Sequence, residues 1–197
     1  MAAIEAFLRD IDGRWKPEGE GKITLQVLGS CALMLQADYE RGTKDGDVLE
    51  TGQLTAPIKR RLSDLAGAGT DLHKRHRLYI DFVPAGLPFL PQRPDFHPAK
   101  SLADLRRFRV EVLDAADVVV SKLKRFKPDD IKDIRAMVVE CGLVDHARLL
   151  ERFHRAADWF SMDARSESLP RIVKNLNTVE REYFDAPPTR IELPEWG

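Results

Sequence analysis

The spacing of apolar residues divides the chain into a first half of strands and helices and a second half of helices alone. Apolar residues three or four positions apart indicate amphipathic helices, and short apolar or alternating runs indicate strands. In the first half this predicts helices over 3–11, 30–37 and 54–65 and strands over 23–28, 45–49, 77–83 and 108–113. In the second half it predicts helices over 115–124, 129–141, 146–157 and 169–184. We therefore expect an α/β (α+β) fold, in which a mixed sheet flanked by helices precedes a helical C-terminal part.

The change of pattern also predicts the domain organisation. We expect a core over 1–113, a helical part over 114–186 that completes the active site, and a tail over 187–197. Between two predicted strands lies a proline-rich segment, 84–98. Proline lacks a backbone N–H and fixes φ, so this segment is predicted to be neither helix nor central strand. Long loops in compact domains often cover a site, and one hypothesis is that this loop shapes an acceptor site.

The first candidate for chemistry is Gly29-Ser30, where a predicted strand ends and a helix begins. The first turn of a helix presents backbone N–H groups without intrahelical partners, which suits a phosphate. The Ser30 hydroxyl is then a phosphate ligand, or Gly29 or Ser30 is simply the helix N-cap. Arg41 follows and either binds a triphosphate or forms a surface ion pair with Asp38 or Asp45.

The second candidate is the pair Asp45 and Asp47, two positions apart on a predicted strand. Side chains at i and i+2 project from the same side of a strand, with their Cβ atoms about 6.5 Å apart. Carboxylates so placed are suited to bind Mg²⁺. A third carboxylate would come from Asp81, which alternates with apolar neighbours, or from Glu111. The alternative interpretation of the D-G-D sequence is a turn or a surface pair.

A third candidate lies downstream, where Lys122 follows an apolar helical turn and Asp130 and Asp133 share one helix face. A lysine can reach a phosphate as a compact point charge. The two aspartates lie near a helix N-terminus, where the macrodipole favours carboxylates, so helix capping alone would also explain them.

Taken together, these residues resemble a known family. The chain is similar to AbiEii-type nucleotidyltransferases in four short motifs that lie between Leu25 and Ile134. These motifs are G-S, R-x-T-x-D-x-D, K-L-x-R and D-x-x-D. AbiEii-type nucleotidyltransferases are bacterial members of the polymerase-beta-like superfamily, and several are toxins of toxin–antitoxin or phage-defence systems. The resemblance implies Mg²⁺-dependent transfer of a nucleoside monophosphate from an NTP to an acceptor hydroxyl, with release of pyrophosphate.

The resemblance also implies roles for single residues. Those carried over are the phosphate-contacting turn Gly29 and Ser30, the metal-binding and catalytic pair Asp45 and Asp47, the phosphate-contacting Lys122 with Arg125 of the same motif, and the downstream acid Asp133 or Asp130. Between the paired aspartates the family usually has a large aliphatic residue, and here it is Gly46. Because glycine weakens a strand and removes a core anchor, either a frayed strand or a drifted site is expected. This favours the alternative of a non-catalytic nucleotide-binding or interaction module.

Composition limits the partners. The formal net charge is −1 with 32% charged residues, so nothing global favours nucleic acid or an anionic membrane. The expected partners are an NTP, an RNA (tRNA in particular) or protein acceptor, and a cognate antitoxin. A sugar- or drug-modifying nucleotidyltransferase is a third alternative, because the same core serves small acceptors. No apolar stretch approaches 18 residues, so no membrane span is expected and the chain is predicted to be cytoplasmic.

Overall fold

The computed structural model describes residues 3–16, 21–161 and 168–191. The chain divides into two compact units. Unit 1 comprises Met1–Leu87 and Phe96–Asp114, and unit 2 comprises Pro88–Asp95 and Ala115–Gly197. The chain therefore passes from unit 1 to unit 2 and back within the proline-rich segment, before the second passage after Asp114.

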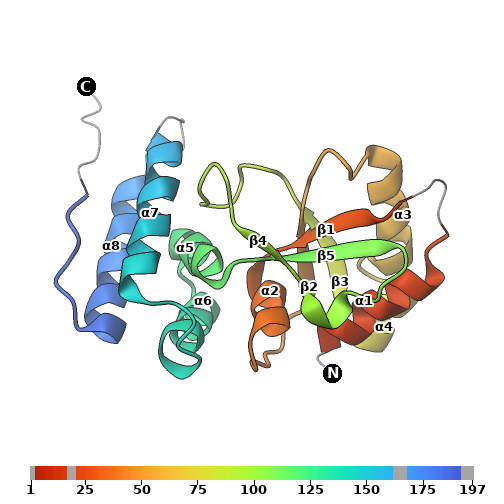
Figure 1. Cartoon of the computed structure of the whole chain (residues 1–197), viewed down its shortest axis with the longest axis horizontal. Coiled ribbons are helices and arrows are strands. Elements are labelled where there is room, and N and C mark those ends of the chain that lie inside the picture. Colours follow the sequence, from red (N-terminus) through yellow and green to blue (C-terminus); the bar gives the residue numbers. More distant parts are fainter. Residues whose placement is uncertain (1–2, 17–20, 162–167, 192–197) are drawn as a thin grey trace. The chain divides into compact units, whose positions relative to one another are not determined.

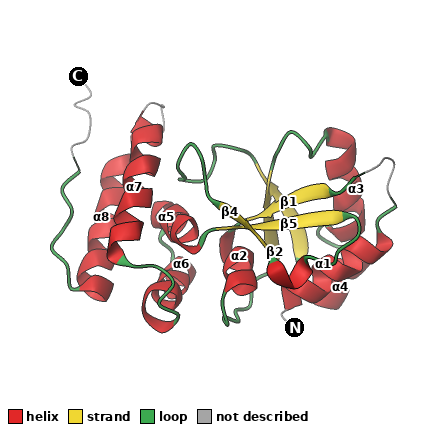
Figure 2. Cartoon of the chain, in the orientation of Figure 1, coloured by secondary structure: helices red, strands yellow, loops and turns green. Residues whose placement is uncertain are grey.

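Unit 1 is a mixed five-stranded sheet with helices (Figures 1 and 2). Its elements are α1 (Ala3–Arg14), β1 (Ile23–Val27), α2 (Gly29–Gln36), β2 (Asp45–Leu49), α3 (Ala56–Ala66), α4 (Asp71–His76), β3 (Tyr79–Val83), β4 (Phe96–Pro98), the 3₁₀ turn η1 (Lys100–Leu102) and β5 (Phe108–Leu113). The strand order is β3-β2-β1-β5-β4. The pairs β1–β5 and β2–β3 are parallel, whereas β1–β2 and β4–β5 are antiparallel. The expected α/β fold with a mixed sheet is confirmed.

The sheet has one apolar face and one polar face. Val27 pairs with Val48 and with Val112 in the neighbouring strands, and all three are buried. Because side chains alternate along a strand, the residues directly before and after each of these valines point to the other face. That face carries polar side chains that are only half-buried, among them Gln26 and Asp47. The polar face is therefore the one available for chemistry.

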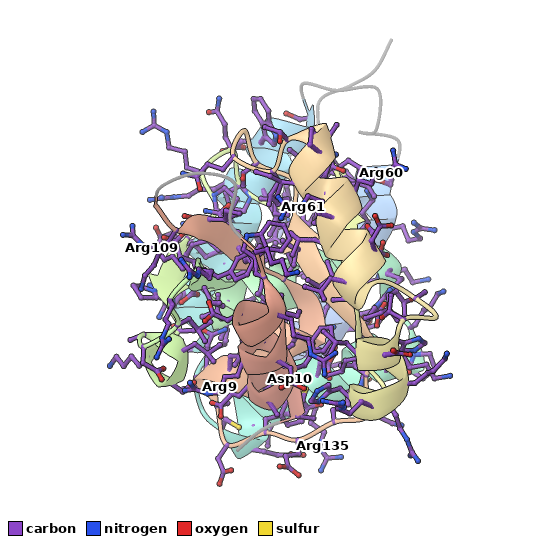
Figure 3. All side chains as sticks on the ribbon, turned by 90° about the vertical axis from the view of Figure 1, so that its right-hand side faces the viewer. Arg9, Asp10, Arg60, Arg61, Arg109 and Arg135 are labelled. Atoms are coloured by element: carbon purple, nitrogen blue, oxygen red, sulfur yellow. The ribbon has the colours of Figure 1, made fainter. Side chains whose placement is uncertain are left out.

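Ion pairs hold the N-terminal helix in unit 1 through Asp10, which Figure 3 labels. On α1, Asp10 accepts hydrogen bonds from His76 at 2.8 Å and from Arg75 at 3.2 Å, both on α4. The hydrogen bond from His76 lowers the pKa of Asp10 against the opposing effect of burial, and that from Arg75 adds to it. On α3, the Arg61 guanidinium lies 4.5 Å from the centre of the Trp15 ring. These contacts join α1 to α4 and Trp15, the residue after α1, to α3.

Unit 2 consists of helices together with the Pro88–Asp95 segment (Figure 1). Its elements are α5 (Ala115–Arg125), α6 (Pro128–Arg135), the π-helical turn η2 (Ala136–Glu140), α7 (His146–Ser161), α8 (Leu169–Val179) and the π-helical turn η4 (Glu180–Phe184). The helix α5 packs against α6, α7 and α8. The apolar stripes read from the sequence are the buried sides of these helices, with Phe153 and Leu176 fully buried. The helical C-terminal part is confirmed.

The helix α4 is missing from the sequence-based prediction because six residues are too short to show a helical period; its signal is Thr70, whose side chain caps His73 N. The proline-rich loop ends in β4, which is an edge strand, as prolines require. The predicted tail 187–197 is extended as far as residue 191, and its remainder lies outside the described residues. No described helix combines the length and apolar character needed to cross a membrane.

Candidate functional site

On the polar face, the Asp47 side chain of β2 lies close to Gly29 at the start of α2. Gly29 has φ of +60°, and a Cβ on it would lie 2.7 Å from Asp47 Oδ2. The backbone continues this contact, since Leu28 N donates to Asp47 O at 2.8 Å. Only glycine combines this left-handed backbone with room for the carboxylate. The predicted Gly-Ser turn and the predicted D-x-D pair therefore meet in space.

Two positive features lie at this turn. The first turn of α2 lies at the positive end of the helix dipole, and Arg41 Nη1 donates to Ser30 Oγ at 3.2 Å. The helix begins at Gly29 and its N-cap is Leu28, which provides no side-chain hydrogen bond. The expectation that Gly29 or Ser30 is the N-cap was wrong. The Ser30 hydroxyl instead lies in the first turn and fixes Arg41 beside it.

The strands β2 and β3 bring the acidic residues together on one face. Their register pairs Asp45 with Tyr79 and Asp47 with Asp81, so the four side chains share one side of the sheet. Asp45 and Asp47 are half-buried, whereas Asp81 is exposed. Thr43 Oγ1 donates to Asp45 Oδ1 at 3.0 Å and orients that carboxylate.

Of the two candidates for a third carboxylate, Asp81 is the one adjacent to the pair. Glu111 lies on β5, separated from β2 by β1, and its Oε2 accepts a hydrogen bond from Gln26 Nε2 at 3.1 Å. Asp81 lies on β3, directly beside Asp47.

Tyr79 belongs to this face and was missed by the sequence reasoning. Burial raises the pKa of its phenol, and the negative charges of Asp45, Asp81 and Asp47 raise it further. Its ring packs edge-on against His73, with centroids 5.2 Å apart. The alternation that predicted the direction of the Asp81 side chain also applied to Tyr79, because Tyr79 lies two residues before Asp81 on the same strand.

Gly46 does not fray the strand, contrary to expectation. All five residues of β2 pair in register with β3, and Gly46 is buried on the apolar face. A Cβ there would lie 3.4 Å from Tyr79 O and 3.9 Å from Ile4 Cδ1 of α1. Helix α1 thus supplies the apolar contact that a larger side chain at this position would have made.

The remaining predicted residues form an ion cluster inside unit 2. Lys122 Nζ lies 2.6 Å from Asp133 Oδ2 and 3.4 Å from Asp130 Oδ1. Both aspartates are fully buried, and Lys122 is 5% exposed. Arg125 adds a bidentate pair to Asp130, with distances of 2.6 and 2.8 Å. The cluster therefore neutralises its own charges.

Asp130 also caps α6. Its Oδ2 accepts from Lys127 N at 3.0 Å, which is the capping role that the sequence left open. Burial by itself would raise the pKa of Asp130. The hydrogen bonds from Arg125 and Lys127 N and the charges of Lys122 and Arg125 outweigh that effect, so the pKa is lowered.

The aspartate pair of unit 1 suits a magnesium ion by its donor chemistry. Within the described ranges, no group of three or more His, Cys, Asp or Glu side chains is arranged to hold a metal ion. Magnesium, however, is usually bound through one or two carboxylates together with waters and substrate phosphates. Asp45 and Asp47 supply those carboxylates, and the Gly29 turn leaves the space beside Asp47 free of a side chain.

Comparisons with known proteins agree with this geometry at the level of family. No curated protein and no solved structure matches the chain. The sequence model of one family, described as "nucleotidyltransferase of unknown function (DUF6036)", matches residues 8–183. This match spans both units and well over half of the 197 residues. The chain therefore belongs to this family of nucleotidyltransferases.

Proposed function

We propose that the protein transfers a nucleoside monophosphate from an NTP to an acceptor hydroxyl, using the polar face of unit 1. One observation carries this proposal: Asp47 Oδ2 lies 2.7 Å from the position that a Cβ of Gly29 would take, at the start of α2. A carboxylate suited to a cation and a helix N-terminus suited to an anion are thereby adjacent. A metal-bound triphosphate needs both at once.

Each residue then has a separate task. The first-turn N–H groups of α2 and the Ser30 hydroxyl bind phosphate oxygens, and Arg41, fixed by Ser30, adds a positive charge. Asp45 and Asp47 hold Mg²⁺, with Asp45 oriented by Thr43. When bound, the ion would neutralise charge on the phosphates as the transfer proceeds.

The reaction balances without a further cofactor. The acceptor oxygen forms a bond to the α-phosphorus, and the bond from that phosphorus to the bridging oxygen breaks. Pyrophosphate leaves with the electron pair, and the acceptor hydroxyl loses its proton. Asp81 is an exposed carboxylate on the same face, in register with Asp47, so it is placed to take that proton or to serve as the predicted third ligand.

Lys122, Arg125, Asp130 and Asp133 keep their predicted roles as hypotheses from the resemblance alone. What their contacts support is a structural task, because the buried lysine and the two buried carboxylates neutralise one another. The AbiEii-type assignment, the toxin–antitoxin role with its antitoxin partner, and the cytoplasmic location likewise stay predictions from the sequence.

The non-catalytic alternative rested on Gly46. Because β2 is complete and Gly46 packs beneath α1, the glycine supplies no argument against a working site. The catalytic proposal is therefore the one that the geometry favours.

Label transfer tests the proposal. The protein is incubated with each α-labelled NTP, Mg²⁺ and total RNA, and label in RNA and in protein is measured separately. Nucleotide binding is followed in parallel with and without Mg²⁺. We expect transfer with at least one NTP, which chelation of the metal abolishes. Absence of both transfer and Mg²⁺-dependent binding would refute the proposal, whereas binding without transfer would favour the non-catalytic module.

A further inference from the structure

A cavity in unit 2 includes residues of the proline-rich segment for which the sequence suggested a role in an acceptor site. It has a volume of about 310 Å³ and is lined by Pro91, Gln92, Arg93, Arg155, Asp158 and Trp159. The first three belong to the Pro88–Asp95 segment and the others to α7. Its size is at the lower end of the range for small-molecule sites, so it suits one small unit of a ligand.

Buried contacts hold the two walls of the cavity together. Arg152 of α7 binds Asp117 of α5 through two hydrogen bonds of 2.6 Å, and it also donates to Arg93 O at 3.2 Å. Asp117 in turn accepts from Asp95 N at 2.7 Å. Phe89, fully buried, packs edge-on against the rings of Phe153 and Phe160. The proline-rich segment is thus fixed to α7. A ligand that binds here would therefore lose little free energy to ordering the segment.

The chemistry of the lining is that of a site for an unpaired base. Trp159 is 37% exposed, which is unusual for a large aromatic side chain in a cavity that contains no other ring. Indole rings stack on any base, and the Gln92 amide and Asp158 carboxylate offer donors and acceptors to a base edge. Arg93 and Arg155 offer guanidinium groups to phosphate.

Both arginines are accessible. Arg93 is exposed, and its guanidinium makes no ion pair with any carboxylate of the described ranges. Arg155 pairs with Glu151 at 2.7 Å, but both side chains are more than half exposed. Exposed pairs of this kind contribute only about 0–1 kcal/mol, so a phosphate can replace the glutamate at little cost.

We propose that this cavity binds one nucleotide of single-stranded RNA, with its base stacked on Trp159 and its phosphate beside Arg93 and Arg155. A protein partner fits less well, because a specific protein interface needs about 800 Å² on each side, whereas the exposed apolar surface here is one tryptophan among charged residues. Duplex RNA would not offer an unstacked base. The inference rests on the proposed function in one respect: an RNA that binds here would be the acceptor of the transferred nucleoside monophosphate.

Fluorescence anisotropy with a labelled octaadenylate RNA tests the inference without any NTP. The decisive pair of variants is Trp159→Phe, which keeps an aromatic face, and Trp159→Leu, which keeps only apolar volume. We expect Trp159→Leu to weaken binding by about 5- to 150-fold, as expected for one lost stacking interaction, and Trp159→Phe to weaken it less. Arg93→Ala with Arg155→Ala should weaken binding and flatten its salt dependence, whose slope in a log–log plot is about −0.7 for one phosphate contact on a single strand.

Matched controls come from the same unit. Val139, which is 52% exposed on η2, and Arg171, which is exposed on α8, line no part of the cavity. Val139→Ala and Arg171→Ala should bind octaadenylate as the wild type does. Thermal unfolding checks that every variant is folded, which is expected because Trp159, Arg93 and Arg155 are surface residues. A blunt 12-base-pair RNA duplex should not displace the octaadenylate.

The outcomes separate this inference from the proposed function. If octaadenylate does not bind, or if Trp159→Leu binds it as tightly as the wild type, the RNA site is refuted and an apolar side chain of a protein partner becomes the better occupant. Label transfer from an NTP would be unaffected by that result. If octaadenylate binding depends on Trp159 while no NTP supports label transfer, the RNA site stands and the proposed catalytic function fails.

Discussion

Asp47 and Asp133 are both carboxylates that the family resemblance assigns to an active site, yet they have different surroundings. Asp133 is fully buried and pairs with Lys122 at 2.6 Å. Asp47 is half-buried on an open sheet face, directly beside Asp81 of the neighbouring strand and close to Asp45. In unit 2 opposite charges compensate one another, whereas in unit 1 like charges are gathered.

The ion cluster of unit 2 stabilises the fold, whereas the neighbouring carboxylates of unit 1 lower its stability in order to form a site. Like charges directly opposite one another in a sheet are destabilising, and sites for ligands are commonly kept at such a cost to stability. Removing a charge should therefore have opposite effects in the two units. The predictions that follow test this contrast, from the largest expected effect to the smallest.

Asp47→Asn should reduce nucleotidyl transfer the most. A bound metal ion contributes several kcal/mol to the transition state, so loss of its ligand should lower kcat/KM by about a thousandfold. Steady-state label transfer measures the effect. Asp38→Asn, an exposed aspartate of the same unit, is the control and should keep full activity. An Asp47→Asn protein as active as the wild type would remove Asp47 from the site.

Lys122→Met should destabilise unit 2. Removing one partner of a buried ion pair leaves uncompensated charge, here on Asp130 and Asp133, at a cost of about 3–5 kcal/mol. Denaturant unfolding measures the change. Lys132→Met removes only an exposed i,i+3 pair with Asp129 and should change stability by less than about 0.5 kcal/mol. If Lys122→Met were inactive yet fully stable, the lysine would belong to the active site and the contrast between the units would fail.

Gly29→Ala and Gly46→Ala should differ in sign. At Gly29 the backbone has a positive φ and a Cβ would meet Asp47 Oδ2 at 2.7 Å, so alanine should cost about 1–3 kcal/mol and displace the carboxylate, lowering activity. At Gly46 a Cβ makes ordinary contacts, so alanine should stabilise by about 0.4–1 kcal/mol with activity unchanged. Denaturant midpoints and label transfer are measured for both. Equal effects would contradict the structure at this turn.

Acid should weaken unit 2 through Asp130. Its pKa is lowered in the folded state, so its ionised form contributes stability above the unfolded pKa of 3.8, and that contribution is lost as the pH falls through the lower folded value. Urea unfolding between pH 7 and pH 2 should show a steeper loss for the wild type than for Asp130→Asn, which starts from lower stability at pH 7. Parallel curves would mean that Asp130 makes no such contribution.

Asp81→Asn should slightly stabilise unit 1. Relieving repulsion with Asp47 should contribute about 0.2–1 kcal/mol. The same change should lower the raised pKa of Tyr79, since Asp81 is one of its causes. Alkaline absorbance titration, with Tyr79→Phe to identify the signal of this tyrosine, measures the pKa. A Tyr79 pKa that does not respond would show that the phenol and Asp81 do not share one face.

Local pattern was enough for most elements and for part of the site. The bounds of β2 and β5 follow from alternation, because period-two burial is imposed by the strand itself. The two-residue spacing of Asp45 and Asp47 and the alternation around Asp81 predicted that these carboxylates face one side of their strands. Tyr79 was missed although the same alternation applied, and α4 was missed because six residues are too short to show a helical period.

By itself the sequence determined most of the helices and strands and the residue types that suit nucleotidyl transfer. Only the tertiary structure decided which of these residues meet. It placed Asp47 against Gly29 and beside Asp81, and it gave Gly46 a packing partner in Ile4. It also enclosed Lys122 between two carboxylates and made a cavity around Trp159. The physical reason is that strand register and helix packing join residues distant in the chain, and no local periodicity carries that information.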